Sequence, residues 1–404
     1  MSPELTWLYS TQLFGIKLGL ENVHKLLEAL ALPAAGMKFI HVAGTNGKGS
    51  TCAFMHAMMR AAGIQAGLFT SPHLVRFNER IRDTEREITD EEIESGLKKI
   101  RELVATWEIH PTFFEIALAL ALDWFRQRGN EWVILETGLG GRLDATNAIT
   151  PEVSVITRIG FDHMEQLGDT MNKIATEKAG IIKPGIPVVT GFQDPSALNV
   201  IQRTAKEVKA PFVLVDEPLQ DTPLGLVGPH QAWNAAIALE GIREAGVRIP
   251  AVQLEKALLD VRWPGRFQAL ADGRIILDGA HNVEAAMTLA ATWDLAYPRE
   301  KADIIFASAK DKDTLGVMEA LSPIAGAWHF TAFASPRATP PEQMRQLLTQ
   351  FDAPKVPVTM HPNLASALQA PTKHRRLICG SLYLVGEALS QLENQAGQYQ
   401  SSLQ

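Results

Sequence analysis

The chain is poor in cysteine: among its 404 residues, Cys52 and Cys379 are the only two, and they lie far apart. Two isolated thiols make neither a disulfide framework nor a metal-ligand cluster. This pattern fits a reducing compartment, so we expect a cytoplasmic protein. The first residues of the chain also lack the basic start and apolar core of a secretory signal, which argues against export.

Long apolar runs and an excess of basic residues are missing as well. The most apolar helical stretch, 113–125, contains Glu115 and Asp123 and is shorter than the roughly 20 residues that cross a bilayer. The formal net charge of −7 argues against a broad surface for nucleic acid. We therefore expect no membrane and no nucleic-acid partner, and chemistry on small molecules is favoured.

Short apolar runs of strand length alternate with helical stretches along most of the chain. Capping boxes at Thr89–Glu92 and Thr112–Glu115 predict the starts of two helices. Predicted strands lie at 38–43, 64–69, 132–135, 153–157, 186–189, 212–215, 267–270, 274–277, 302–307, 327–331, 356–360 and 376–379. Strands that alternate with helices predict an α/β fold with mainly parallel sheets covered on both faces.

A glycine-rich turn between a predicted strand and a predicted helix is the strongest functional signal. It reads Gly44-Thr45-Asn46-Gly47-Lys48-Gly49-Ser50-Thr51, and such a turn presents backbone N–H groups to a phosphate at a helix N-terminus. Lys48 adds positive charge. The spacing is a variant of the usual phosphate loop, because Val42 and Gly49 replace the usual Gly and Ser or Thr. Taken alone, the loop is compatible with a GTPase switch, a transporter ATPase, a kinase or a ligase.

Polar residues that suit a metal ion follow two other predicted strands. Glu136 ends an apolar run and precedes a glycine-rich loop, which is where a carboxylate can hold Mg²⁺ beside a triphosphate. His163 follows the run at 153–157, and Lys178 comes fifteen positions later. A lone histidine of this kind is more often structural than a ligand.

Together these segments resemble the bifunctional dihydrofolate synthase/folylpolyglutamate synthases of the Mur ligase superfamily. The resemblance rests on the loop 41–51, on the segment 135–147 and on the His163 to Lys178 spacing. It also rests on the order of Asn234, Arg266, Asp278 and His281, and it extends from about 18 to 385.

The resemblance implies roles for individual residues. ATP would be bound by the loop 44–51, with Asn234 at the adenine, Arg266 at the γ-phosphate and Asp278 at the ribose. The resemblance implies two Mg²⁺ ions, a carbamylated lysine at Lys178 and, as an optional further ion, a monovalent cation. A carbamate would turn Lys178 into a carboxylate-like anion that pairs with a divalent ion. The implied metal ligands are Ser50, Ser71, Glu136, His163 and Lys178.

The substrates would lie beside these groups. Phe114 would pack on the pterin, Asp144 would contact the folate or pteroate, and His281 and Ser381 would lie near the incoming glutamate. The implied catalytic set is Lys48, Glu136, His163, Lys178, Arg266 and His281. No general base is assigned, and His281 is the residue to test.

The resemblance implies an ATP-dependent ligase that joins L-glutamate to the carboxylate of dihydropteroate, of a (poly)glutamylated reduced folate, or of both. A carboxylate is a poor electrophile, so it would first attack the γ-phosphate of ATP and form an acyl phosphate. Lys48, Arg266 and Mg²⁺ would stabilise the charge of the transition state. We expect a monomer.

Two domains are predicted around a segment at 261–266 that contains proline and glycine. Residues 1–263 would form a P-loop ATPase-like domain that binds ATP and folate, and 264–266 would form a hinge. Residues 267–404 would form a smaller, Rossmann-like glutamate-ligase domain. The polar tail from about 394 has too little apolar content to order itself.

Two other interpretations stay open. A Mur-type ligase joins an amino acid to a UDP-linked muramoyl acceptor by the same chemistry, but such enzymes carry an extra N-terminal domain, and the loop that begins at Gly44 leaves no room for one. A P-loop ATPase or switch protein would bind nucleotide without ligation. The set of Glu136, His163 and Lys178 disfavours that second alternative.

Overall fold

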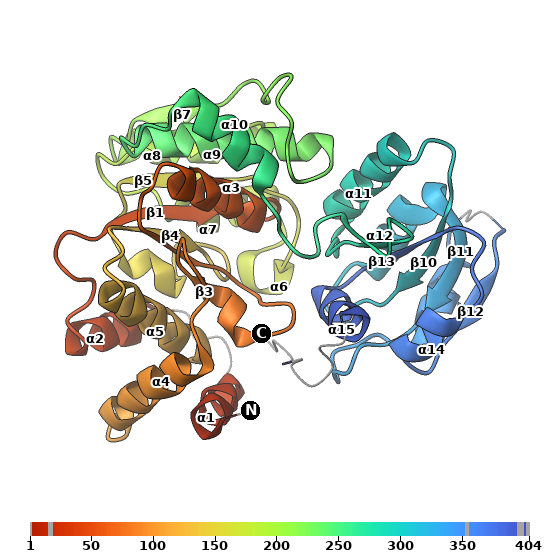
Figure 1. Ribbon diagram of the computed structural model, residues 1–404, viewed down its shortest axis with the longest axis horizontal. Coiled ribbons are helices and arrows are strands. Elements are labelled where there is room, and N and C mark those ends of the chain that lie inside the picture. The colour runs from red at the N-terminus through yellow and green to blue at the C-terminus, as the bar shows by residue number, and fades with distance from the viewer. Residues whose placement is uncertain (1, 15–18, 352–354, 394–399, 401–404) are drawn as a thin grey trace.

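The computed structural model of the protein describes residues 2–14, 19–351, 355–393 and 400. It contains two α/β units, each built around its own sheet (Figure 1). This arrangement confirms the predicted fold class. The tail predicted to be disordered lies outside the described residues except for Gln400, whose backbone N–H donates to the Val75 carbonyl at 2.7 Å.

The first sheet has seven strands within the described ranges. They are β1 (Lys38–Ala43), β2 (Ala66–Phe69), β3 (Ile81–Arg82), β4 (Trp132–Glu136), β5 (Val153–Ile156), β6 (Val188–Thr190) and β7 (Phe212–Leu214). Their order is β3-β2-β4-β1-β5-β6-β7, and every pairing is parallel except that of β2 with β3. The strand β1 is therefore central, between β4 and β5.

Helices cover both faces of this sheet. They are α1 (Pro3–Ser10), α2 (Glu21–Ala29), α3 (Lys48–Ala61), α4 (Asp90–Val104), α5 (Phe113–Gln127), α6 (Met164–Leu167), α7 (Met171–Ala179), α8 (Pro195–Glu207), α9 (Pro229–Glu244) and α10 (Ala251–Asp260). Successive strand residues point to opposite faces. In β1, Phe39 packs with α1, α2, α4 and α5, whereas Ile40 and Val42 pack with α3, α9 and α10.

The second sheet is smaller and also mainly parallel. Its strands are β8 (Gln268–Leu270), β9 (Ile275–Leu277), β10 (Ala302–Phe306), β11 (Ala325–Phe330), β12 (Val358–Met360) and β13 (Arg375–Cys379), in the order β12-β11-β10-β13-β9-β8. Only the hairpin β8–β9 is antiparallel. The helices are α11 (Val283–Ala296), α12 (Thr314–Leu321), α13 (Pro341–Leu347), α14 (Leu364–Gln369) and α15 (Leu382–Leu392). The helices α11 to α13 pack on one face, and α14 and α15 pack on the other.

Some element ends differ from the predicted ones for local reasons. The strand β2 begins at Ala66 because Ile64 still bonds to the carbonyl of Met59 and completes the end of α3. The strand β6 begins at Val188 because Pro187 has no N–H to give to a ladder. No helix of the described chain combines the length and apolarity that spanning a bilayer requires.

The two units meet where their strands end. Leu74 and Val75, which follow β2, pack in the same cluster as Leu384 and Val385 of α15. In parallel sheets the carboxyl ends of all strands lie at one edge, and loops at that edge carry ligand sites. The carboxyl ends of β1, β4 and β5 and those of β9, β10 and β13 border one cleft of ≈ 480 Å³.

Candidate functional site

The glycine-rich turn connects β1 to α3 at the centre of the first sheet. Gly44 has φ 150°, and a Cβ there would lie 1.9 Å from Thr157 Oγ1; Gly47, the N-cap of α3, has φ 90°. The backbone N–H groups of Thr45 and Asn46 donate to the Arg158 carbonyl at 2.9 and 3.0 Å. The first-turn amides of α3 have no partner within the helix, so they are the donors available to a phosphate.

Lys48 lies over this turn. Its Nζ donates to the carbonyls of Gly44 at 3.0 Å and Thr45 at 3.2 Å, which places a cation where phosphate oxygens would arrive. Gly49 and Ser50 line the cleft, whereas Thr51 is buried outside the lining. The loop can therefore receive an anion through both backbone dipoles and the lysine charge.

Glu136 lies at the end of β4, beside β1. Its Oε2 accepts a hydrogen bond from the backbone N–H of Ser71 at 3.1 Å. Burial raises the pKa of the Glu136 carboxyl, although Lys48 and the Ser71 hydrogen bond act in the opposite direction. A divalent cation would offset this burial cost, so Glu136 and Ser71 fit a Mg²⁺ site.

Lys178 of α7 approaches the same turn from the other side. Its Nζ donates to the Gly44 carbonyl at 2.9 Å. Burial, with a further contribution from the charge of Lys48, lowers the pKa of Lys178 to about 7. The amine is therefore partly neutral near pH 7, which is the form that reacts with electrophiles.

His163 begins α6 with a left-handed φ of 50°, and burial lowers its pKa to about 4. Its Nε2 lies 3.4 Å from Lys312 Nζ, a residue of the second domain. The described residues contain no cluster of three His, Cys, Asp or Glu side chains suited to a metal. Mg²⁺ commonly takes only one or two carboxylates and fills its shell with phosphate oxygens and water, so the donors present fit that kind of site.

The second domain contributes residues that follow β9 and β13. Asp278 accepts hydrogen bonds from the amides of Phe267 at 2.9 Å and Ala280 at 2.8 Å, and burial raises its pKa. Ser381 lies in the cleft and caps α15 through the Tyr383 amide. Asn234 of α9 contacts the turn from the first domain, because a Cβ on Gly47 would lie 2.5 Å from its Oδ1.

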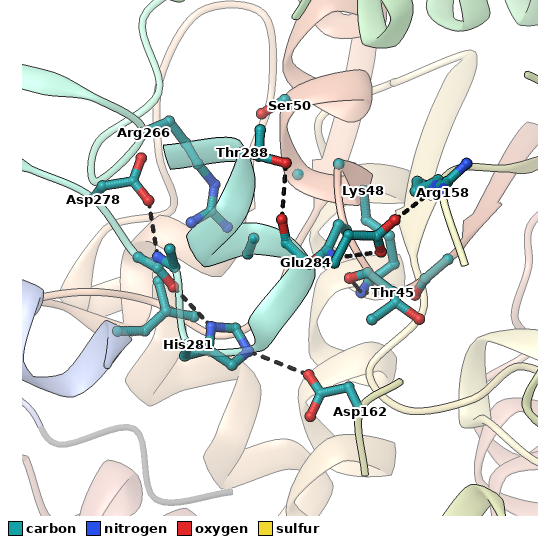
Figure 2. A pocket seen from close by; sticks show the side chains of 18 of the residues that line it. Thr45, Lys48, Ser50, Arg158, Asp162, Arg266, Asp278, His281, Glu284 and Thr288 are labelled. Carbon is teal, nitrogen blue, oxygen red and sulfur yellow. Dashed lines mark hydrogen bonds and ion pairs between the residues drawn. The ribbon is translucent and has the colours of Figure 1, made fainter. Parts of the chain in front are cut away.

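His281 has a neighbour at each ring nitrogen. Nδ1 lies 2.7 Å from the Gly279 carbonyl, and Nε2 lies 3.3 Å from Asp162 Oδ2. A carbonyl only accepts, so Nδ1 carries a proton, and Nε2 faces a carboxylate (Figure 2). The role of His281 as general base stays a prediction.

Most predicted site residues border the one cleft, but three do not. Those in the lining are residues 44–50, Ser71, Glu136, His163, Lys178, Asn234, Arg266, Asp278, His281 and Ser381. Thr51, Phe114 and Asp144 lie outside the lining. Asp144 is buried, and its carboxylate accepts from the amides of Gly138, Leu139 and Thr146, which shapes the glycine-rich loop. Phe114 packs on Phe69 with ring centroids 5.5 Å apart, and the substrate contacts of both residues stay predictions.

The polar residues of the cleft that were not found from the sequence include Arg158, Asp162, Glu284 and Lys312. Asp162 forms an ion pair with Lys312 across the two domains, and their side chains are 9 and 10% exposed. The position of Asp162 beside His163 and that of Lys312 shortly after a strand were signals in the sequence. The pairing itself depends on how the two sheets face each other.

A phosphate-binding turn and a second α/β unit facing it define an ATP-dependent ligase of the Mur type. The family described as Mur ligase middle domain matches residues 42–222, and the family described as Mur ligase, glutamate ligase domain matches residues 265–381. A curated Bacillus subtilis relative, named dihydrofolate synthase/folylpolyglutamate synthase, is 37% identical over 367 residues, covering 83% of this chain and 85% of the relative. The chain belongs to the dihydrofolate synthase/folylpolyglutamate synthase family.

Solved structures agree with this assignment. An Escherichia coli protein in complex with DHPP and ADP superposes with a TM-score of 0.86 at 30% identity, covering 98% of each chain. A bifunctional folylpolyglutamate synthase/dihydrofolate synthase with Mn, AMPPNP and L-glutamate bound superposes with a TM-score of 0.85 at 31% identity, covering 97% of this chain and 98% of that one.

Proposed function

We propose that this chain is an ATP-dependent ligase that joins L-glutamate to the carboxylate of dihydropteroate, of a reduced folate, or of both. One observation carries the proposal: the phosphate-binding turn of one sheet and the Asp278, His281 and Ser381 side chains of the other border the same cleft. A nucleotide on the turn and an amino acid on the second domain would meet there. The bound ligands of the related structures support the same pairing.

The chain's own residues would carry the first chemical step. The acceptor carboxylate attacks the γ-phosphorus of ATP, the bond to the β,γ-bridging oxygen breaks, and ADP leaves with that oxygen. The amides of the first turn of α3, with Lys48, hold the phosphate oxygens and stabilise the added charge. In the second step the glutamate amine attacks the acyl carbon, phosphate leaves, and the nitrogen gives up one proton as the amide forms. The closed cleft would keep water from the acyl phosphate.

Glu136, Ser71 and Ser50 would hold one divalent cation, and His163 with a modified Lys178 would hold a second. Bound Mg²⁺ would supply charge neutralisation for the phosphate oxygens. The neutral amine of Lys178 favours carbamylation, since the reaction with CO₂ needs the free lone pair. The monovalent cation stays a prediction, because no described feature points to it.

We also propose the division of the chain at 264–266, with residues 1–263 as the ATP- and folate-binding domain and 267–404 as the glutamate-ligase domain. The two sheets end and begin on either side of this segment, at β7 and β8. The matched family segments, 42–222 and 265–381, support it. We propose a monomer, because both walls of the cleft come from one chain.

The activity test offers ATP, Mg²⁺ and glutamate with dihydropteroate and tetrahydrofolate in separate reactions. We expect phosphate release only when acceptor and glutamate are both present, with a product heavier by one glutamyl unit by mass spectrometry. Lys48→Ala is the inactive control, since it removes the phosphate-binding cation. Phosphate release without acceptor and glutamate would instead indicate a switch ATPase. Turnover of a UDP-linked muramoyl acceptor alone would indicate the cell-wall ligase.

A further inference from the structure

The first turn of α11 in the second domain reaches directly onto the phosphate-binding turn. Asn46 donates to Asn282 Oδ1 at 3.3 Å and to Glu284 Oε2 at 3.2 Å, and Asn282 donates back to Asn46 Oδ1 at 3.1 Å. Both residues that bond to the Asn46 side chain belong to the second domain. These hydrogen bonds therefore fix the second domain against the loop that would hold ATP.

An ion pair across the domains reinforces this contact. Arg158 Nε donates to Glu284 Oε1 at 2.6 Å, and the two side chains are 36 and 32% exposed. Figure 2 shows Glu284 between Arg158 and the turn that carries Thr45 and Lys48. The Arg158 guanidinium lies 4.9 Å from the ring centroid of Phe192, which holds it in place.

Backbone geometry makes room for the carboxylate. Glu284 Oε2 lies 2.2 Å from where a Cβ on Gly160 would be, so a larger residue at position 160 would require the Glu284 carboxylate to shift. Arg158 also offers its own carbonyl to the amides of Thr45 and Asn46. The residue that pairs with the second domain thus also shapes the phosphate-binding turn.

We propose that Arg158 and Glu284 form an interdomain latch that holds the second domain closed over the phosphate-binding turn. The two residues are positioning residues: they act by bringing Asp278, His281 and Ser381 into place over the nucleotide. The inference rests on the proposed function for its kinetic readout. Neutralisation of Glu284 by Arg158 has a second consequence, since an unpaired carboxylate beside this turn would repel the phosphates of ATP.

An ion pair this exposed contributes little to folding, but in the proposed latch it would hold two domains in one arrangement relative to each other. A fivefold change in the closed-to-open ratio corresponds to about 1 kcal/mol at 1.4 kcal/mol per tenfold, which lies within the range measured for such pairs. In the proposed latch only the closed arrangement makes this ion pair. The whole free energy of the pair would therefore act on the ratio of closed to open protein.

A double-mutant cycle tests the latch with Arg158→Ala, Glu284→Ala and the combined variant. We expect each single variant to lower kcat/KM for glutamate about fivefold, and the combined variant to lose no more than either alone. We also expect KM for ATP to rise more in Arg158→Ala than in Glu284→Ala, because only the former leaves the carboxylate unpaired. The matched controls are Arg243→Ala and Glu240→Ala, an exposed pair 3.3 Å apart on α9, which should leave every parameter unchanged.

A second readout does not need ligase activity. Small-angle X-ray scattering with AMPPNP and Mg²⁺ should show a larger radius of gyration for each single variant than for the unmodified chain, with unchanged melting temperatures. The latch would be overturned if the single variants behaved like the unmodified chain. It would also be overturned if the combined variant lost about 25-fold in kcat/KM for glutamate, which is the result for two independent effects. If the unmodified chain showed the smaller radius of gyration but made no glutamyl product, the proposed function would be overturned and the latch would stand.

Discussion

Among single side chains, Lys178 shows most clearly how burial prepares a residue for chemistry. An exposed lysine keeps its proton at neutral pH, whereas burial near Lys48 lowers the pKa of Lys178 to about 7. The unmodified ammonium faces a backbone carbonyl, at Gly44 O, and it would repel a divalent cation. Carbamylation would replace that positive charge with an anion and convert a repulsive neighbour into a metal ligand.

We therefore expect activity to depend on CO₂ and pH through this residue. Chain held in CO₂-free buffer should lose ligase activity and regain it when dissolved CO₂ is restored. The neutral amine is the reactive form and increases above the pKa, so at fixed CO₂ the recovery should be about tenfold faster at pH 8 than at pH 6 for a pKa near 7. Assays of activity against time measure this rate.

Lys183 offers a matched control for this test. It is a nearby lysine that donates to the Asn147 carbonyl at 2.9 Å and lies outside the cleft lining. Lys183→Arg should keep the CO₂ response, whereas Lys178→Arg should be inactive at every CO₂ level, because arginine does not lose its proton. Full activity of Lys178→Arg would contradict the proposed role.

Among the secondary structure elements, α3 is positioned by a glycine at each end. Gly47 precedes it with φ 90°, and Gly63 follows it with φ 73°. A Cβ on Gly47 would lie 2.5 Å from Asn234 Oδ1, whereas a Cβ on Gly63 would meet nothing within 4 Å. Both positions carry the left-handed backbone cost for alanine, but only one carries a clash at the nucleotide site.

This difference allows a matched comparison of Gly47→Ala with Gly63→Ala. Each should lose about 1 to 2 kcal/mol of unfolding free energy from the left-handed backbone, measured by urea denaturation. Only Gly47→Ala should also weaken binding of AMPPNP, by tenfold or more, because it displaces Asn234 and the turn. Equal nucleotide affinities of the two variants would show that the turn tolerates the change.

Elements such as α4 and α5 could be predicted because their signals are local. The capping boxes at Thr89 and Thr112 are both present with reciprocal bonds, and short apolar runs between helical stretches indicated the strands of both sheets. Asp144 shows the limit of local signals: the family resemblance implied a substrate contact, which stays a prediction, and the hydrogen bonds that its carboxylate accepts from the glycine-rich loop were not foreseen. The interdomain partners of Asp162 and Glu284 could not be predicted, because they depend on how two separate sheets face each other.

At the scale of the whole molecule, Arg266 is a residue whose charge acts on carboxyl groups of both domains. It lies between the domains and borders the cleft. Burial raises the pKa of both Glu136 in the first domain and Asp278 in the second, and the charge of Arg266 acts in the opposite direction on both. A single guanidinium therefore partly offsets the burial of a carboxylate from each domain, and its planar pair of donors would suit a transferring phosphoryl group.

Removal of this side chain should affect turnover far more than folding. We expect Arg266→Ala to lower kcat by about 100-fold or more, since arginines that stabilise phosphoryl transfer contribute at least that much. The unfolding free energy should change far less, because Arg266 forms no ion pair among the described residues and its charge acts on Glu136 and Asp278 only at longer range. Arg266→Lys should recover part of the rate, since it keeps the charge but loses the second donor.

Arg262, four positions earlier, is the control for this experiment. It is exposed, donates to the Leu259 and Val261 carbonyls at the end of α10, and lies outside the cleft lining. Arg262→Ala removes the same positive charge near the hinge as Arg266→Ala does. We expect its kcat to equal that of the unmodified chain. If steady-state assays gave equal kcat for Arg266→Ala and Arg262→Ala, the long-range charge of the hinge, and not a contact with the transferring phosphoryl group, would account for whatever rate was lost.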